Sequence, residues 1–234
     1  MTSDISHNGF FITLEGPDGV GKGTQLKFIK EYLRENNGGR GRIYTKEPGS
    51  SRNNVCEKIR EITLNPKNDV DDEAEIFLYM ADRCQHVQKV VLPALRNGDI
   101  VVCDRYVDST YAYQGFGRRK GTPEALEKIN YLNNVSTFGL VPDLTIIFHA
   151  DAEIGLSRLG TEEFGEPDRL EMQGLDFHQR VVQGYRHLYE NKGDRNIALI
   201  NVQGKTPEEV REETIKSLND FAYDKLLNKI EMEN

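Results

Sequence analysis

The sequence predicts an α/β fold of three layers, in which a five-stranded parallel sheet is flanked by helices. Short apolar runs alternate along the chain with longer stretches whose hydrophobic residues recur at helical spacing, which is typical of a parallel sheet covered by helices. The chain has 234 residues, which suits one large domain better than two.

Five short apolar runs are the expected strands. In chain order they are 10–14, 43–45, 100–103, 144–148 and 198–202. Such sheets bind ligands at the carboxyl ends of their strands. The residues that directly follow these runs are therefore the first place to look for chemistry.

The stretches between the runs are the expected helices. The first is clear because Leu26, Ile29 and Leu33 fall on one face. The helices are expected at 22–35, 52–64, 72–96, 123–133, 152–159, 175–190 and 207–221. We expect a single domain over 1–221 with a lid at about 158–173, and a C-terminal extension over 222–234.

The charge balance disfavours several classes of partner. Asp and Glu number 38 against 30 Lys and Arg, a formal net charge of -8, which repels nucleic acid and anionic membranes. No apolar run approaches the roughly 18 residues of a membrane span, and no secretory signal is visible. Three widely spaced cysteines suit reduced thiols. We expect a cytoplasmic protein without nucleic-acid or membrane partners.

A glycine-rich turn follows the first expected strand. It reads G-P-D-G-V-G-K-G-T and fits G-x-x-x-x-G-K. Its glycines let backbone N–H groups surround phosphate oxygens, while the following helix and the lysine add positive charge. We expect a P-loop NTPase fold. The expected ATP-binding residues are Gly16, Pro17, Asp18, Gly19, Val20, Gly21, Lys22, Gly23 and Thr24.

A Mg²⁺ ion is expected beside this turn. Gly23 lacks the usual hydroxyl ligand, but Mg²⁺ keeps several waters when bound, so Thr24 or water can replace it. Asp104 follows the third apolar run and is placed to deliver a carboxylate to the metal side of the phosphates. The alternative interpretation of Asp104 is a turn former.

The P-loop alone does not define the reaction. The string N-K-G-D at 191–194 matches the guanine-reading N-K-x-D of GTPases. It follows an expected helix instead of a strand, and no D-x-x-G follows the third run, so we interpret it as a helix-ending turn. The G-K-G-T string also occurs in adenylate kinases.

A longer motif is more specific. Residues 104–115, D-R-Y-V-D-S-T-Y-A-Y-Q-G, resemble the D-R-Y/H-x-x-S-x-x-A-Y-Q-G signature of thymidylate kinases. Further likenesses follow in the family's order: E-G at 15–16, T-K-E-P-G at 45–49, L-Y-M-A-D-R at 78–83, P-D-L-T at 142–145 and D-R-L-E at 168–171. The resemblance covers about residues 9–220. It implies transfer of the γ-phosphoryl group of ATP to dTMP, in a homodimer.

The resemblance also implies roles in the acceptor site. Tyr79 and Arg83 lie four apart and share a helix face; in the family, the matching Phe stacks on thymine and the matching Arg bonds its O4. Arg105 would clamp the acceptor phosphate, Tyr113 would pack on the sugar, and Asp18 resembles the carboxylate near the sugar and metal. Ser109, Thr110 and Gln114 are further candidates for contact with base or sugar, or solvated helix residues.

A phosphotransferase is also expected to supply a cation at the transferred group, where an Arg can contribute about 10³ to 10⁵ in rate. Bacterial thymidylate kinases commonly place it in a basic lid and others in the P-loop, but here 160–167 is acidic and neither Gly19 nor Val20 is Arg. Our second candidates are Arg118, Arg119 and Lys120. Our first candidates are Arg158 and Arg169. The expected catalytic residues are Lys22, Asp18, Arg105, Arg158 and Arg169.

Two other functions stay open. Gly23, Lys46, Tyr79 and the acidic lid depart from the commonest family pattern, which leaves room for a deoxynucleoside monophosphate kinase of different or broader base specificity. The missing lid cations leave room for a nucleotide-binding regulator without catalysis.

Overall fold

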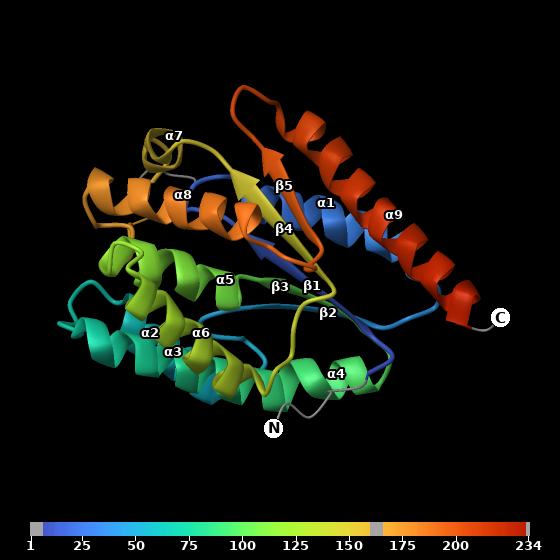
Figure 1. The fold of residues 1–234 in the computed structure, drawn as a ribbon, viewed down its shortest axis with the longest axis horizontal. Coiled ribbons are helices and arrows are strands. Elements are labelled where there is room, and N and C mark those ends of the chain that lie inside the picture. The colour runs from blue at the N-terminus through green and yellow to red at the C-terminus, as the bar shows by residue number, and fades with distance from the viewer. Residues whose placement is uncertain (1–6, 160–165, 233–234) are drawn as a thin grey trace.

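The central sheet confirms the expected α/β fold. The structure is a computed structural model and describes residues 7–159 and 166–232, with side chains described as far as residue 222. In this part of the chain, five parallel strands lie in the order β2-β3-β1-β4-β5 between two layers of helices (Figure 1). The strands are β1 (Phe10–Glu15), β2 (Arg42–Lys46), β3 (Ile100–Asp104), β4 (Leu144–His149) and β5 (Ile197–Asn201).

The register brings polar residues to one edge of the sheet. Leu14 of β1 and Lys46 of β2 both pair with Asp104 of β3. Each strand includes one or two residues that the apolar runs did not cover, and in β1 to β4 backbone pairing continues onto polar residues at the strand ends. Glu15, Lys46 and Asp104 therefore meet at the carboxyl edge, where ligands of parallel sheets bind.

Helices cover both faces of the sheet. Ile12 and Leu14 share a core with α1 (Lys22–Glu35) and α9 (Pro207–Met232), whereas Phe11 packs on the other face. This alternation is expected of a strand buried on both sides. The remaining helices are α2 (Asn54–Leu64), α3 (Asp72–His86), α4 (Leu92–Arg96), α5 (Val107–Thr110), α6 (Pro123–Thr137), α7 (Ala152–Leu156) and α8 (Leu175–Glu190), with π-helical segments η1 (Val87–Val91) and η2 (Tyr111–Arg118).

Some helix predictions were incomplete. The stretch 72–96 is interrupted by the π-helical η1 instead of forming one α-helix, and α7 ends at Leu156 instead of 159. The chain over 107–118 is helical although no helix was expected there. Packing explains this helix: η2 lies so close to α8 that a Cβ at Gly184 would be 2.9 Å from the Cα atom of Ala112. Close tertiary contact thus overrides weak local propensity.

The C-terminal helix is longer than expected. α9 runs to Met232, across the expected boundary between residues 221 and 222, because no Gly or Pro interrupts the sequence after Pro207. The division into a domain and an extension stays a prediction. Residues 160–165 of the expected lid lie outside the described residues. No described helix is long and apolar enough to cross a membrane.

Candidate active site

The P-loop connects β1 to α1 and is fixed by close backbone contacts. Gly16 has a φ of 133°, and a Cβ there would lie 2.2 Å from the carbonyl oxygen of Phe148 in β4. Gly19, with a φ of 73°, is similarly close to Gly155 in α7. The residues expected to bind ATP, 16–24, form this turn and the first turn of α1. Val20 packs into the core, so it can offer phosphate only its backbone.

Lys22, the first residue of α1, folds back over the turn. Its Nζ donates hydrogen bonds to the carbonyl oxygens of Gly16 (2.9 Å) and Pro17 (2.7 Å). Burial and then the charge of Arg105 lower its pKa to about 8, against the opposite effect of nearby carboxylates. A bound phosphate would favour the charged form. Lys22 is therefore placed to exchange carbonyl partners for phosphate oxygens.

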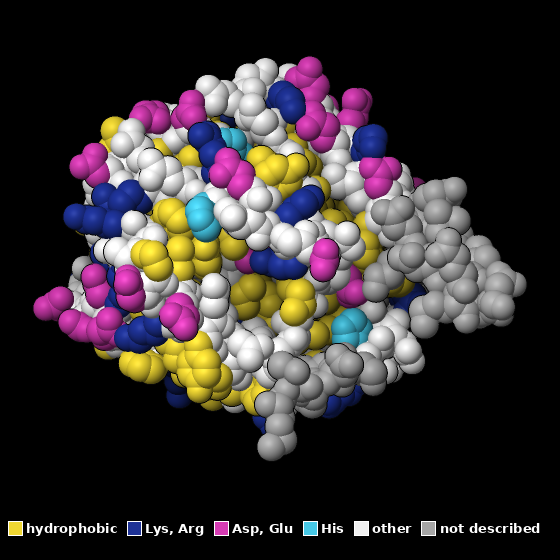
Figure 2. Space-filling view, in the orientation of Figure 1, with side chains coloured by type: hydrophobic (Ala, Val, Ile, Leu, Met, Phe, Trp, Pro, Cys, Tyr) yellow, Lys and Arg dark blue, Asp and Glu magenta, His cyan; other side chains and the backbone are white. Residues whose placement is uncertain are grey.

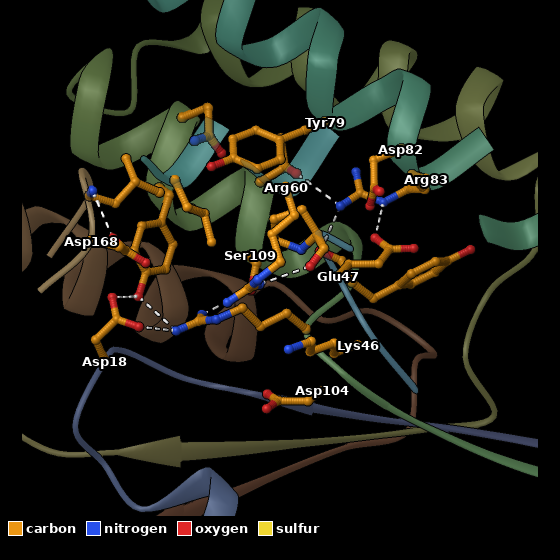
Figure 3. Close-up of a pocket in the computed structure, with 18 of the residues that line it drawn as sticks. Asp18, Lys46, Glu47, Arg60, Tyr79, Asp82, Arg83, Asp104, Ser109 and Asp168 are labelled. Carbon is orange, nitrogen blue, oxygen red and sulfur yellow. Dashed lines mark hydrogen bonds and ion pairs between the residues drawn. The ribbon is translucent and has the colours of Figure 1, made fainter. Parts of the chain in front are cut away.

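A pocket of about 250 Å³ opens beside the P-loop, at the carboxyl ends of β2 and β3, and α2, α3, α5 and η2 enclose it (Figure 3). All the expected acceptor residues line it: Tyr79, Arg83, Arg105, Ser109, Thr110, Tyr113 and Gln114. The pocket also contains residues that we had not assigned to the site: Lys46, Glu47, Arg60, Asp82, Asp168 and Glu171. Lys46 ends β2 and Glu47 follows it, a signal that could have found them, whereas nothing local marks Arg60.

Arg105 joins the P-loop to this pocket. Its φ of 72° is uncommon for a residue other than glycine. Nη1 donates to the carbonyl oxygen of Gly16 (3.0 Å) and to Ser109 (3.1 Å), while Nη2 pairs with Asp18 and donates to the Tyr113 hydroxyl (3.1 Å). The guanidinium therefore lies between the P-loop and the pocket.

Asp18 is held ionised by this arrangement. Its carboxylate also accepts a hydrogen bond from Tyr113 (2.6 Å). Burial alone would raise the pKa of Asp18, but Arg105 and Lys22 outweigh burial and lower it. Asp18 thus fixes the Tyr113 ring against the pocket.

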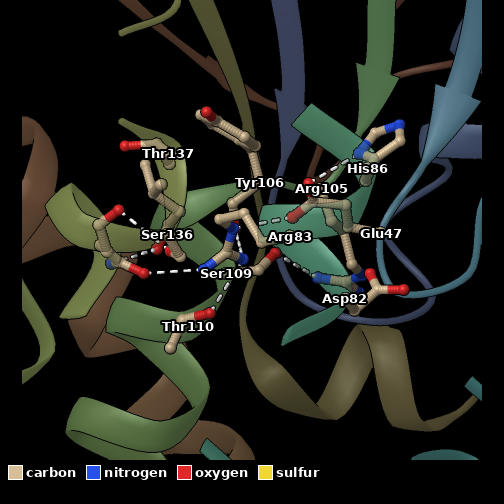
Figure 4. A network of polar contacts seen from close by, with 12 residues as sticks. Glu47, Asp82, Arg83, His86, Arg105, Tyr106, Ser109, Thr110, Ser136 and Thr137 are labelled. Atoms are coloured by element: carbon tan, nitrogen blue, oxygen red, sulfur yellow. Dashed lines mark hydrogen bonds and ion pairs between the residues drawn. The ribbon is translucent and has the colours of Figure 1, made fainter. Parts of the chain in front are cut away.

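Arg83 is the centre of a buried network (Figure 4). Its Nε donates to Glu47 (2.8 Å), Nη1 to Asn133 (2.7 Å), and Nη2 to both the Tyr106 carbonyl oxygen and Thr110 (3.0 Å each). Each Nη carries two N–H groups, so Nη1, which has one acceptor, keeps a second N–H for a ligand. Removing Arg83 would leave the buried Glu47 carboxylate without its main partner, a strongly destabilising change. Loss of Arg83 is therefore a poor probe of base recognition.

Tyr79 presents an aromatic ring to the pocket, across from Lys46 and Asp104 in Figure 3. The side chain is buried, and its hydroxyl has no hydrogen-bond partner among the described residues. Burial raises the pKa of Tyr79, so the hydroxyl remains a donor at neutral pH. Gln114, also expected to reach the ligand, lines the pocket but donates a hydrogen bond to Glu75 (2.8 Å).

The candidate catalytic cations make different contacts in the structure. Arg158 donates to the carbonyl oxygen of Gly19 in the P-loop (2.8 Å). Arg169 instead pairs with Glu75 and donates to the Thr63 carbonyl oxygen (2.8 Å), on the side of α2 and α3. Two of the second candidates form ion pairs, Arg118 with Asp72 and Glu75, and Arg119 with Glu73. The third, Lys120, lies just after η2.

Asp104 is the residue that best fits a cation. It ends β3, and its Oδ1 atom is buried without a hydrogen-bond partner among the described residues. No group of three or more His, Cys, Asp or Glu residues in the described ranges is arranged to hold a metal. An ion here must take most ligands from phosphate and water, which is the usual behaviour of Mg²⁺.

The fold and this site together define a P-loop kinase of the nucleoside monophosphate class, because a phosphate-binding turn opens onto a separate pocket with an aromatic ring and buried arginines. Comparison with known proteins makes the assignment narrower. The family model described as thymidylate kinase matches residues 14–214. The chain therefore belongs to the thymidylate kinase family, and the function implied by the sequence resemblance is confirmed.

Individual relatives agree with this assignment. The chain is 42% identical over 190 residues to the thymidylate kinase of Clostridium novyi (strain NT), a match that covers 81% of this chain and 89% of that protein. The crystal structure of thymidylate kinase from Ehrlichia chaffeensis superposes with a TM-score of 0.70 at 29% identity. That superposition covers 90% of this chain and 98% of the other.

Proposed function

We propose that this protein transfers the γ-phosphoryl group of ATP to the 5′-phosphate of dTMP, producing ADP and dTDP. The observation that best supports the proposal is the position of Arg105, which contacts the P-loop at Gly16 and also lines the pocket that holds Tyr79. A single guanidinium between the two sites suits a reaction that aligns two phosphorylated molecules end to end.

The proposed mechanism depends on positioning and charge. The P-loop and Lys22 bind the donor phosphates, and Arg105 binds the acceptor phosphate. Asp18, through Tyr113, fixes the acceptor sugar, and Arg158 adds positive charge beside Gly19. Mg²⁺ bound with ATP, next to Asp104 and Thr24, would neutralise charge on the phosphates. Phosphoryl transfer needs little covalent help from a protein, so positioning and charge are the contributions that this mechanism requires.

An assay with separate acceptors tests the proposal. The purified protein is incubated with Mg-ATP and, in turn, dTMP, dUMP, dCMP, dAMP and dGMP, and the diphosphates are separated by chromatography. The expected result is rapid formation of dTDP and ADP. Faster turnover of another acceptor would instead favour the kinase of different or broader specificity. A regulator without catalysis would form no diphosphate from any of them.

Tyr79 gives a prediction about base recognition. Tyr79→Ala is expected to raise KM for dTMP by about 5- to 100-fold, since stacking on one base contributes about 1 to 3 kcal/mol. Tyr79→Phe keeps the ring and removes a hydroxyl that has no partner, so its KM should stay within about threefold of the wild-type value. Initial rates at varied dTMP and saturating Mg-ATP measure both. Equal KM values for the two variants would contradict a stacking role.

We also propose that the protein is a homodimer. Large hydrophobic side chains are exposed on neighbouring helices, and they gather over α3 and α6 at the lower left of Figure 2. Exposed apolar patches commonly mark contact surfaces. The residues concerned are Val55, Ile62, Phe77, Tyr131, Val135 and Phe138. Light scattering is expected to give twice the chain mass of 26.7 kDa, and a mass of one chain would contradict the dimer.

A cytoplasmic location is proposed as well. Cys56, Cys84 and Cys103 are all free thiols, as expected in a reducing compartment.

A further inference from the structure

Glu15, the last residue of β1, is a fully buried carboxylate beside the Arg105 backbone. Its Oε1 accepts a hydrogen bond from the backbone N–H of Tyr106 (2.7 Å). Its Oε2 accepts from the hydroxyls of Ser109 (2.6 Å) and Tyr185 (3.0 Å). Glu15 therefore holds three donors that surround the arginine expected to clamp the acceptor phosphate.

The same two hydroxyls also contact Arg105. Its Nη1 donates to Ser109 (3.1 Å) and to Tyr185 (3.3 Å). A hydroxyl that gives its proton to Glu15 keeps lone pairs for the guanidinium. A protonated Glu15 would carry a donor of its own and accept fewer bonds. Two of the contacts that orient Arg105, those to Ser109 and Tyr185, thus depend on Glu15 being ionised.

A second buried carboxylate, Asp108, directly precedes Ser109, whose hydroxyl donates to Glu15, and its charge opposes that ionisation. Burial and then the charge of Asp108 raise the pKa of Glu15 to about 7, while Ser109 and Arg105 lower it. The ionisation of Glu15 therefore depends on the charges around it. The titratable and charged groups that act on it, from all the elements packed around it, are Lys22, Cys103, Arg105, Asp108, Tyr185 and Arg195.

Arg195 binds Asp108 through two parallel hydrogen bonds, from Nη1 to Oδ1 (2.9 Å) and from Nη2 to Oδ2 (2.6 Å). It lies just before β5, next to the turn at 191–194 that ends α8. Neither Arg195 nor Asp108 lines the acceptor pocket; both border a separate hollow of about 180 Å³. Any effect of Arg195 on the reaction must therefore pass through other residues.

We propose that Arg195 is a positioning residue that acts through Asp108 and Glu15. With the Asp108 charge neutralised, Glu15 stays an ionised acceptor, and the hydroxyls that it holds keep Arg105 aimed at the acceptor phosphate. This role rests on the proposed transfer to dTMP.

The proposal predicts opposite effects of two substitutions on the pH profile. Removing the cation in Arg195→Gln leaves Asp108 to repel Glu15 unopposed, which raises the pKa of Glu15 further. Removing the anion in Asp108→Asn lowers that pKa. Since Glu15 must be ionised, activity is lost as pH falls through its pKa. The acidic limb of the pH–activity profile, where activity falls with falling pH, therefore moves to higher pH in Arg195→Gln and to lower pH in Asp108→Asn.

The test is the pH dependence of kcat/KM for dTMP, which reports groups of the enzyme form that binds dTMP. It is measured from about pH 5.5 to about pH 9 at saturating Mg-ATP for the wild type, both single variants and the double variant. The dTMP phosphate titrates identically in all of them. Lys216→Gln serves as the matched control, because it breaks an exposed ion pair with Asp220 on α9.

Arg195→Gln is expected to move the acidic limb up by about half a pH unit or more and to lower kcat/KM for dTMP at pH 7 by about 3- to 10-fold, with an unchanged KM for ATP. The double variant, which leaves no unpaired carboxylate, should return the limb towards its wild-type position. Lys216→Gln should match the wild type throughout.

An acidic limb that stays in place in Arg195→Gln overturns the proposal. So does an equal loss of kcat/KM for dTMP and for ATP, which a merely structural role would produce. If Arg195→Gln does not fold, Asp108→Asn decides the question, since an unmoved limb there overturns the proposal too. A wild type that forms no dTDP would refute the proposed function itself, and this role with it.

Discussion

Arg105→Ala is expected to lower kcat/KM for dTMP by about 10³-fold, which is typical of losing a preorganised charged donor at a reacting group. In the structure, Arg105 spans the P-loop and the acceptor pocket and is anchored by Asp18 and Tyr113. The variant keeps Lys22 and the P-loop, so KM for ATP should change by less than about threefold. Initial rates at varied dTMP and then at varied ATP separate the two effects.

Two further variants sharpen this experiment. Arg105→Lys keeps the charge but not the planar fork, so we expect an intermediate loss of about 10- to 100-fold. Arg34→Ala removes an exposed arginine of α1 and should match the wild type. If Arg105→Ala weakened ATP and dTMP equally, its bond to Gly16 would be its main role, and the acceptor clamp would be wrong.

The P-loop and the acceptor residues could be predicted because local sequence specifies them. Gly16 and Gly19 are required where the turn passes β4 and α7, so their pattern is visible in the chain. Tyr79 and Arg83 share a helix face through their spacing alone. The alternation of strands and helices predicted the parallel sheet, but the strand order β2-β3-β1-β4-β5 was not predicted.

The partners of these residues could not be predicted, because they come from distant parts of the chain. Arg60 reaches the pocket because its Nη1 donates to the Pro48 carbonyl oxygen (2.9 Å), a contact that no periodicity reveals. Glu15 looks like the end of an apolar strand, and Arg195 like part of a polar turn. Their joint effect on Arg105 depends on packing between β1, α5, α8 and the segment before β5.

The catalytic cation is another feature that the sequence alone could not identify. Arg158 and Arg169 were equivalent in sequence, since each flanks the acidic segment. The structure makes them different: Arg158 contacts Gly19 in the P-loop, whereas Arg169 is paired with Glu75. Proximity in sequence could not distinguish them, because Glu75 lies far away on α3.

Arg158→Ala is therefore expected to lower kcat by about 10³-fold, the lower end of the range for an arginine that stabilises a transferring phosphoryl group. KM for dTMP should change little, because Arg158 is not part of the acceptor pocket. Arg169→Ala is expected to lower kcat by less than about 10-fold. It should instead lower thermal stability, since it removes one partner of the buried Glu75 carboxylate.

Single-turnover rates are measured by mixing dTMP with enzyme that already holds Mg-ATP. They report the chemical step directly, so product release does not hide the effect. Arg158→Lys is the matched variant, and we expect it to recover part of the loss because it keeps a charge without the fork. A larger loss in Arg169→Ala than in Arg158→Ala would reverse the assignment and require Arg169 to leave Glu75 when the substrates bind. Losses below about threefold in both would place the catalytic cation elsewhere in the chain.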